Sequence, residues 1–178
     1  MRLPHGFVVL LICLLGVLTL EAQKEKREPL TSAQIEEIRE AGINPGERVK
    51  LYTKFLDAQA EAIKDLGGRV KSSTRSHRLD EQLQDFTALM DEFGSNLDLY
   101  SERHADIRKP LKSLTEATQR WLGILRGLAG DPVFELARKE SVESGEDLAE
   151  QATHMLQEQT EYFKVHKDEE GQERTEPK

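Results

Sequence analysis

One stripe of side chains constrains the fold of this 178-residue chain more than any other feature. From Leu79 to Leu128 its members recur at alternating steps of three and four, which places them on one face only if the segment is helical. The stripe consists of Leu79, Leu83, Phe86, Met90, Phe93, Leu97, Tyr100, His104, Ile107, Leu111, Leu114, Thr118, Trp121, Leu125 and Leu128. We therefore expect an all-α fold, an antiparallel bundle of three to four long helices.

Pro110 lies within this segment but off the stripe, and the spacing continues past it without a slip. Proline removes a helical hydrogen bond and crowds the preceding turn, so it bends or breaks a helix. The unbroken spacing favours one long helix bent near Pro110 in an elongated bundle. Because about 50 helical residues would span roughly 75 Å, the alternative is a chain that folds back into four shorter helices. Gly94-Ser95-Asn96 is a second candidate break.

The N-terminal region has the pattern of a signal peptide, which we assign to residues 1–22. Arg2 precedes an apolar run from Phe7 to Leu20, and Ala22 supplies a small residue at the expected cleavage site. The run is short for a permanent membrane span, which needs about 20 apolar residues. We expect a protein exported to the periplasm or secreted after cleavage, with an uncleaved N-terminal anchor as the alternative.

The remaining chain divides into a charged linker at residues 23–31, a helical bundle at 32–164 and a disordered polar tail at 165–178. Thr31 and Gln34 have the spacing of a capping box, and Asn44-Pro45-Gly46-Glu47 is a second helix start. Short loops predict two antiparallel hairpins. Helix 45–66 would pair with the first half of the long segment, and the last helix with the second half.

Leu30-Thr31-Ser32-Ala33-Gln34 is similar to the LTxxQ motif of the small periplasmic chaperones of the Spy type. The similarity covers five residues and occurs once, whereas that family typically carries two copies. It implies a helical periplasmic protein that binds unfolded chains. A helix cap at Thr31 accounts for the same residues.

Composition narrows the classes of function. The net charge of −8 argues against nucleic acid as a partner, because phosphate binding needs concentrated positive charge. The only cysteine, Cys13, lies in the apolar N-terminal run, so we expect neither disulfides nor thiolate metal sites in the mature chain. No nucleophile elbow, phosphate-binding loop or haem-attachment motif is present. We therefore predict that the protein is not an enzyme and needs no cofactor.

The predicted middle of the bundle offers the one candidate cluster for metal or acid–base chemistry. The hairpin arrangement would bring His154 to the level of His104, with Asp106 and Tyr100 nearby. Two imidazoles and a carboxylate are suitable ligands for zinc. His104 also fits a core polar residue that sets helix register, and His154 lies on a polar face, so we assign no metal site.

Two features suggest contact with other molecules. An apolar tip, formed by Trp121, Leu122, Ile124, Leu128 and Phe134, carries more apolar surface than one partner helix covers, unless the two helices bury it between themselves. Two basic clusters could meet anionic lipid, or could be solvated surface. They consist of Arg69, Lys71, Arg75, His77 and Arg78, and of Arg103, Arg108, Lys109 and Lys112.

These observations predict a non-catalytic exported bundle that acts by binding another protein or itself, with a homo-oligomer as one form. The first alternative is a chaperone-like or lipid-binding helical protein. If it binds lipid, its partner would be a membrane surface. The heptad period argues against apolipoprotein-type helices, which follow an 11-residue period. A metal-binding bundle is the last alternative.

Overall fold

The first two helices begin at the residues that the sequence predicts. The computed structural model describes residues 28–101 and 105–171, and in it α2 spans Ser32–Glu40 and α3 spans Pro45–Gly67. The Thr31 hydroxyl accepts from the Gln34 backbone N–H, and the Gln34 side chain accepts from Thr31, so the capping box is confirmed. The Asn44 side chain caps α3 by accepting from the Glu47 N–H at 3.1 Å.

The long heptad segment forms two helices, which corrects the expectation of one helix bent near Pro110. Helix α4 spans Ser73–Ser101 and α5 spans Arg108–Gly127. Pro110 is the third residue of α5, where a backbone N–H would have no helical acceptor, so the proline costs α5 no hydrogen bond. The chain turns just before it, and α4 continues unbroken through Gly94-Ser95-Asn96.

The last helix, α6, spans Glu135–Val165 and is followed by the 3₁₀ turn η1 at Lys167–Glu169. The described part of the predicted disordered tail is therefore ordered as far as Gly171. The Tyr162 hydroxyl donates to Glu169 at 2.6 Å, and the Gly171 N–H donates to Asp106 at 3.0 Å. The second contact joins residues 65 positions apart, which explains why the polar composition of the segment did not predict it.

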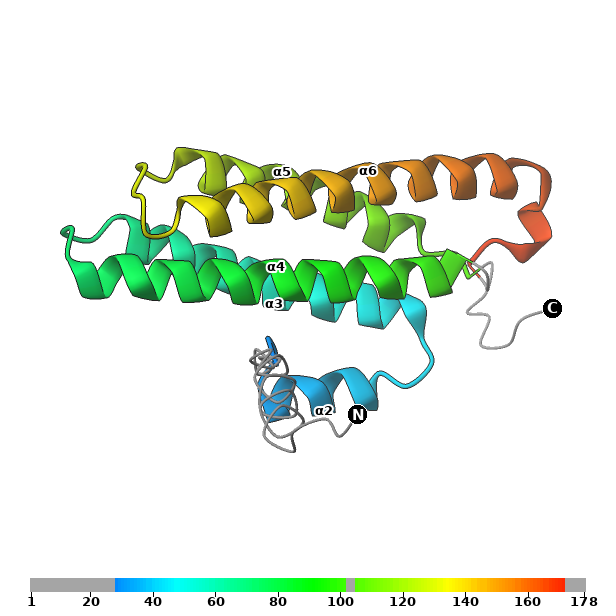
Figure 1. Ribbon diagram of the computed structural model, residues 1–178. Helices are drawn as coiled ribbons and strands as arrows, with labels where there is room; N and C mark the ends of the chain where they lie inside the picture. The colour runs from blue at the N-terminus through cyan, green and yellow to red at the C-terminus, as the bar shows by residue number, and fades with distance from the viewer. Residues whose placement is uncertain (1–27, 102–104, 172–178) are drawn as a thin grey trace, which may run out of the picture.

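Helices α3 to α6 form a four-helix bundle in which the two predicted hairpins lie side by side (Figure 1). Within each hairpin, α3–α4 and α5–α6, the helices run antiparallel. Between the hairpins α3 packs along α5 and α4 along α6, each pair running parallel, so α4 and α5 face each other across the diagonal. The described residues thus contain five α-helices and no strand, with one helix more than the bundle count predicted from sequence.

The heptad stripe faces the inside of this bundle. Every described member is buried except Leu128, which is partly buried against the core. Tyr52 of α3 stacks on Phe93 of α4 with ring centroids 4.8 Å apart, and Phe86 contacts the edge of Trp121 at 5.9 Å. The Trp121 indole N–H donates to Asp57 at 2.7 Å, so the largest core side chain is also satisfied as a hydrogen-bond donor. The stripe therefore packs against other helices of the same chain.

Helix α2 lies outside the four-helix bundle and packs on α3 (Figure 1). Leu30 and Ile38 are buried in this contact, and Gln59 donates to the Pro29 carbonyl at 3.0 Å. The end of the predicted linker is therefore docked on the bundle. None of the helices in the described ranges has an apolar stretch long enough to cross a bilayer. The predicted signal peptide lies outside the described residues.

Replacing Phe93 with alanine should strongly destabilise the bundle. Phe93 is fully buried, so Phe93→Ala removes the ring stacked on Tyr52 and leaves a cavity, which costs about 3–5 kcal/mol of unfolding free energy. Leu99→Ala on the same helix is the control, because Leu99 is 55% exposed. Urea unfolding followed by circular dichroism measures both. Equal losses in the two variants would contradict the core assignment.

Candidate functional site

The predicted apolar tip is largely covered within the chain. Trp121, Leu122 and Phe134 are 1%, 3% and 0% exposed. Ile124 and Leu128 are partly buried and pack against the core. Because α5 and α6 bury these side chains between themselves and their neighbours, they offer little surface to a partner in this fold.

The predicted histidine cluster is not formed by the described residues. His104 lies outside them. His154 is on the surface of α6 with its side chain 71% exposed, and its Nδ1 lies 3.4 Å from a Glu158 oxygen. Asp106 lies in the connection between α4 and α5, just before the first residue of α5, and it is bonded to Arg108. No group of three or more His, Cys, Asp or Glu side chains in the described ranges is placed to bind a metal ion.

A surface groove between α4 and α6 is the most developed candidate site. It encloses about 540 Å³ and is lined by Asp98, Asp147, Glu150, Gln151, His154, Met155 and Glu158. A smaller hollow of about 240 Å³ shares Asp147 and Gln151 with it and extends to Met90, Asp91, Gly94, Ser144 and Leu148. We call the two together the acidic groove. Its apolar members, Met90, Leu148 and Met155, are core side chains only 1%, 3% and 4% exposed, so they lie at the floor and the accessible lining consists mainly of polar and acidic residues.

Neutral donors on α6 bind the carboxylates of α4 along this groove. The Gln151 amide donates to Asp98 at 2.6 Å and to the Gly94 carbonyl at 3.0 Å. The Ser144 hydroxyl donates to Asp91 at 2.6 Å. Gly94 makes room for this contact, since a Cβ there would lie 3.1 Å from the Gln151 Oε1. These bonds set the spacing of the two helices.

Charge is strongly segregated toward this side of the bundle. From Leu79 to Ser101, α4 has six acidic residues and no Lys or Arg, and from Glu140 to Phe163, α6 has seven and none. By contrast, α5 carries five Lys or Arg residues and one acidic residue, Glu116. Carboxylates on one face raise the local concentration of cationic molecules and speed their association. The groove is therefore suited to a positively charged partner.

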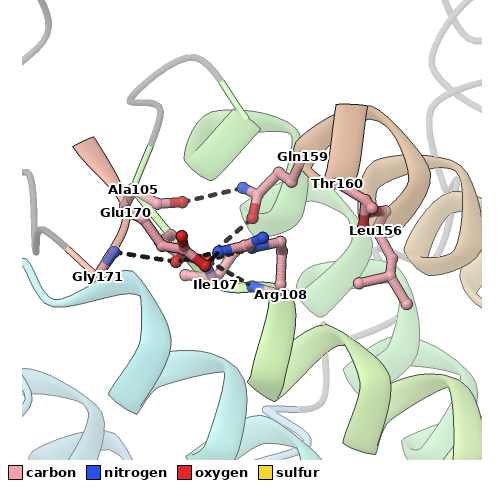
Figure 2. Close-up of polar contacts among 9 residues, drawn as sticks. Ala105, Ile107, Arg108, Leu156, Gln159, Thr160, Glu170 and Gly171 are labelled. Carbon is pink, nitrogen blue, oxygen red and sulfur yellow. Dashed lines mark hydrogen bonds and ion pairs between the residues drawn. The ribbon is translucent and has the colours of Figure 1, made fainter. Parts of the chain in front are cut away.

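A second polar centre holds the connection between α4 and α5. The buried Gln159 side chain of α6 accepts from the Ile107 N–H and donates to the Ala105 carbonyl, each at 3.0 Å (Figure 2). Both backbone groups lie where the helix is interrupted, so neither has a helical partner. One amide side chain satisfies both of them.

Asp106 links this connection to the C-terminal turn. Its two oxygens accept from Arg108 at 2.9 and 2.8 Å, and one accepts from the Gly171 N–H (Figure 2). Arg108 also pairs with Glu170 at 2.6 Å, and its guanidinium lies 4.6 Å from the Phe163 ring centroid. Hydrogen bonds from Arg108 lower the pKa of Asp106 below its usual value, and the same bonds raise the pKa of Arg108. This centre has a structural role.

Sequence reasoning missed the acidic groove and the Gln159 contacts. The groove joins residues about 50 positions apart, and the pairing of α4 with α6 follows from the fold-back that the heptad phase concealed. One signal was present in the sequence, namely the two long runs without Lys or Arg. Gln159 gave no signal, because a glutamine on a helix usually faces solvent.

No known protein-family model matches the chain, and comparisons with curated proteins and with solved structures found no match.

Replacing Gln159 with methionine should destabilise the protein, although methionine fits the same space. Gln159→Met leaves the Ile107 N–H and the Ala105 carbonyl buried without partners, which costs about 2–6 kcal/mol for the two groups. Gln157→Met is the control, because Gln157 is exposed and bonds only Glu161. Urea unfolding measures the free energy of unfolding of both variants. A loss for Gln159→Met no larger than that of the control would show that the contacts contribute little.

Replacing Asp106 with asparagine should reduce the acid sensitivity of folding. The folded-state pKa of Asp106 lies below its ordinary value of 3.8, so its stabilisation is complete above that value and is lost as the pH falls through the folded-state pKa. The free energy of unfolding should therefore fall less between about pH 5 and pH 3 in Asp106→Asn than in the wild type. Glu140→Gln, at an exposed position on α6, is the control and should retain the wild-type slope.

Proposed function

We propose that this chain is a non-catalytic, exported helical-bundle protein that acts by binding another protein through the acidic groove between α4 and α6. The observation that carries the proposal is the carboxylate rim of one open groove. A partner segment with Lys or Arg along one face matches this rim. An amphipathic basic helix has this pattern.

The free energies of the individual contacts indicate what the rim and the floor of the groove each contribute to binding. Exposed ion pairs contribute only about 0–1 kcal/mol each, so the rim carboxylates mainly accelerate and orient the encounter. The apolar contribution is small, because Met90 and Met155 at the floor are only 1% and 4% exposed, so the proposed binding is weak and reversible. Such a site accepts partners of varied sequence that share a basic, amphipathic pattern.

Self-association through the heptad stripe has less support. The stripe favoured it from the sequence, but α4 and α5 bury their stripe positions against α3 and α6 in one chain. The exterior surface that remains for a partner includes the acidic groove. We therefore favour a different protein as the partner.

A synthetic amphipathic Leu/Lys helix is a suitable probe for the groove, with titration calorimetry as the measurement. Removing two rim charges with Asp147→Asn and Glu150→Gln should weaken binding about tenfold, as expected for two lost interactions of about 0.7 kcal/mol each. Raising the salt from 50 to 300 mM should weaken wild-type binding as well, because exposed charges are screened.

The matched control for this titration is Glu140→Gln combined with Glu143→Gln. These exposed residues lie on the same helix but do not line the groove, and the double change alters the net charge equally. The control should change the affinity less than twofold. Equal weakening by both double variants would mean that the probe responds to overall charge, and absence of binding would contradict the proposed function.

A further inference from the structure

At the end of the bundle opposite the α4–α5 connection, the α3–α4 loop and the α5–α6 turn lie next to each other (Figure 1). The Ser76 hydroxyl donates to Asp131 at 2.7 Å and joins the two segments. Gly67 packs so closely on Leu128 that a Cβ at Gly67 would lie 2.6 Å from a Leu128 methyl carbon. We call this end, formed by residues 67–78 and 128–139, the loop tip.

The loop tip exposes large apolar side chains. Val70 is 90% exposed, Leu136 70% and Val133 43%. They are three of the six large hydrophobic side chains exposed in the described ranges. Two segments that are distant in sequence thus present their apolar side chains at the same end of the bundle, which differs from single apolar residues scattered over a surface.

The same tip is rich in cations. Residues 67–78 include four Lys or Arg residues and no acidic residue. Arg75 is buried and donates to the Leu66 and Gly67 carbonyls, at 3.0 and 2.7 Å, so it fixes the loop. Arg69, Lys71 and Arg78 are exposed, and the first two flank Val70 in sequence.

The two carboxylates of the loop tip at Asp131 and Glu135 already have partners. Asp131 accepts from the Val133 N–H at 3.0 Å and from Ser76, and Glu135 pairs with Arg138 at 2.7 Å. The hydrogen bonds from Val133 and Ser76 lower the pKa of Asp131, and the charge of Lys71 adds to this effect. Both acidic groups therefore serve the fold of the tip.

We propose that the loop tip docks end-on on an anionic lipid surface, with Val70, Val133 and Leu136 entering the headgroup region. Arg69, Lys71 and Arg78 would then contact lipid phosphates. Cations near an anionic bilayer contribute about 1 kcal/mol each, and apolar side chains in the interface add to this. Side chains that project from the end of a bundle suit a soft interface better than a protein partner, which requires about 800 Å² of complementary surface.

End-on docking keeps the acidic groove away from the bilayer. Asp147, the groove carboxylate closest to the tip along α6, is 12 residues beyond the first residue of that helix, which corresponds to roughly 18 Å. The Debye length at physiological ionic strength is about 8 Å, so carboxylates at that distance do not oppose docking. The acidic groove and the basic tip are therefore compatible in one molecule of net charge −8.

A fluorescent probe at the tip tests the proposal in the full-length chain. With Cys13, the only cysteine, replaced by serine, Val70→Cys carries an environment-sensitive nitrobenzoxadiazole label, and Val165→Cys, 77% exposed on α6, is the control. Vesicles of phosphatidylcholine with 30% phosphatidylglycerol should shift the emission at position 70 to the blue and leave position 165 unchanged. Pure phosphatidylcholine vesicles should shift neither. Because the readout is local, binding through any other segment leaves it unchanged.

Neutralising tip cations should weaken the response. Arg69→Gln with Lys71→Gln should raise the lipid concentration at half-response about 25-fold, from about fivefold for each charge. Lys109→Gln with Lys112→Gln, two exposed positions on α5, should change it less than twofold. Three outcomes would overturn the proposal: no shift at position 70, equal shifts at both positions, or equal weakening by both double variants. A shift that requires no lipid and grows with protein concentration would assign the tip to a second copy of the chain instead.

Discussion

The reversal of the chain between α4 and α5 is the constraint on which the rest of the structure depends. The heptad stripe is continuous, so without a reversal the segment would be one extended helix with half of its stripe facing solvent. Where the helix is interrupted, backbone groups lose their helical hydrogen-bond partners. Each such group would cost about 1–3 kcal/mol if it were buried without a new partner. Gln159 bonds the Ala105 carbonyl and the Ile107 N–H, so these two buried groups are satisfied and this cost is avoided. The four-helix core follows from this turn.

The fold-back also determines the surface. Once α4 lies beside α6, two helices with acidic exteriors are neighbours, and their like charges repel each other. The repulsion is moderate, because the carboxylates stay at the solvent-exposed edge, and Ser144 and Gln151 of α6 donate hydrogen bonds to Asp91 and Asp98 of α4. Neutral donors opposite carboxylates hold the helices together without adding positive charge. The groove consequently stays acidic.

Much of the fold was predictable because its signals are local. The Thr31 and Asn44 caps depend on residues three positions apart, and the hairpins follow from short loops. The break before Pro110 was not predictable, since proline is compatible both with a kink and with the first turn of a new helix. The side-by-side pairing of the hairpins, and with it the groove, depends on contacts such as Ile107 with Gln159, 52 residues apart.

The two candidate surfaces are physically independent, which makes the functional proposals separable. The loop tip contains the first turn of α4, whereas the groove uses Met90 to Asp98 of the same helix, and the two surfaces share no residue. Energetic effects at sites more than about 7–10 Å apart with no common partner are generally additive. A chain bound to lipid through its tip would therefore present an unaltered groove, directed along the bundle and away from the bilayer. The packed core between the loop tip and the acidic groove sets the distance from one to the other. The same packing that buries the heptad stripe would therefore also set the position of the groove relative to the bilayer.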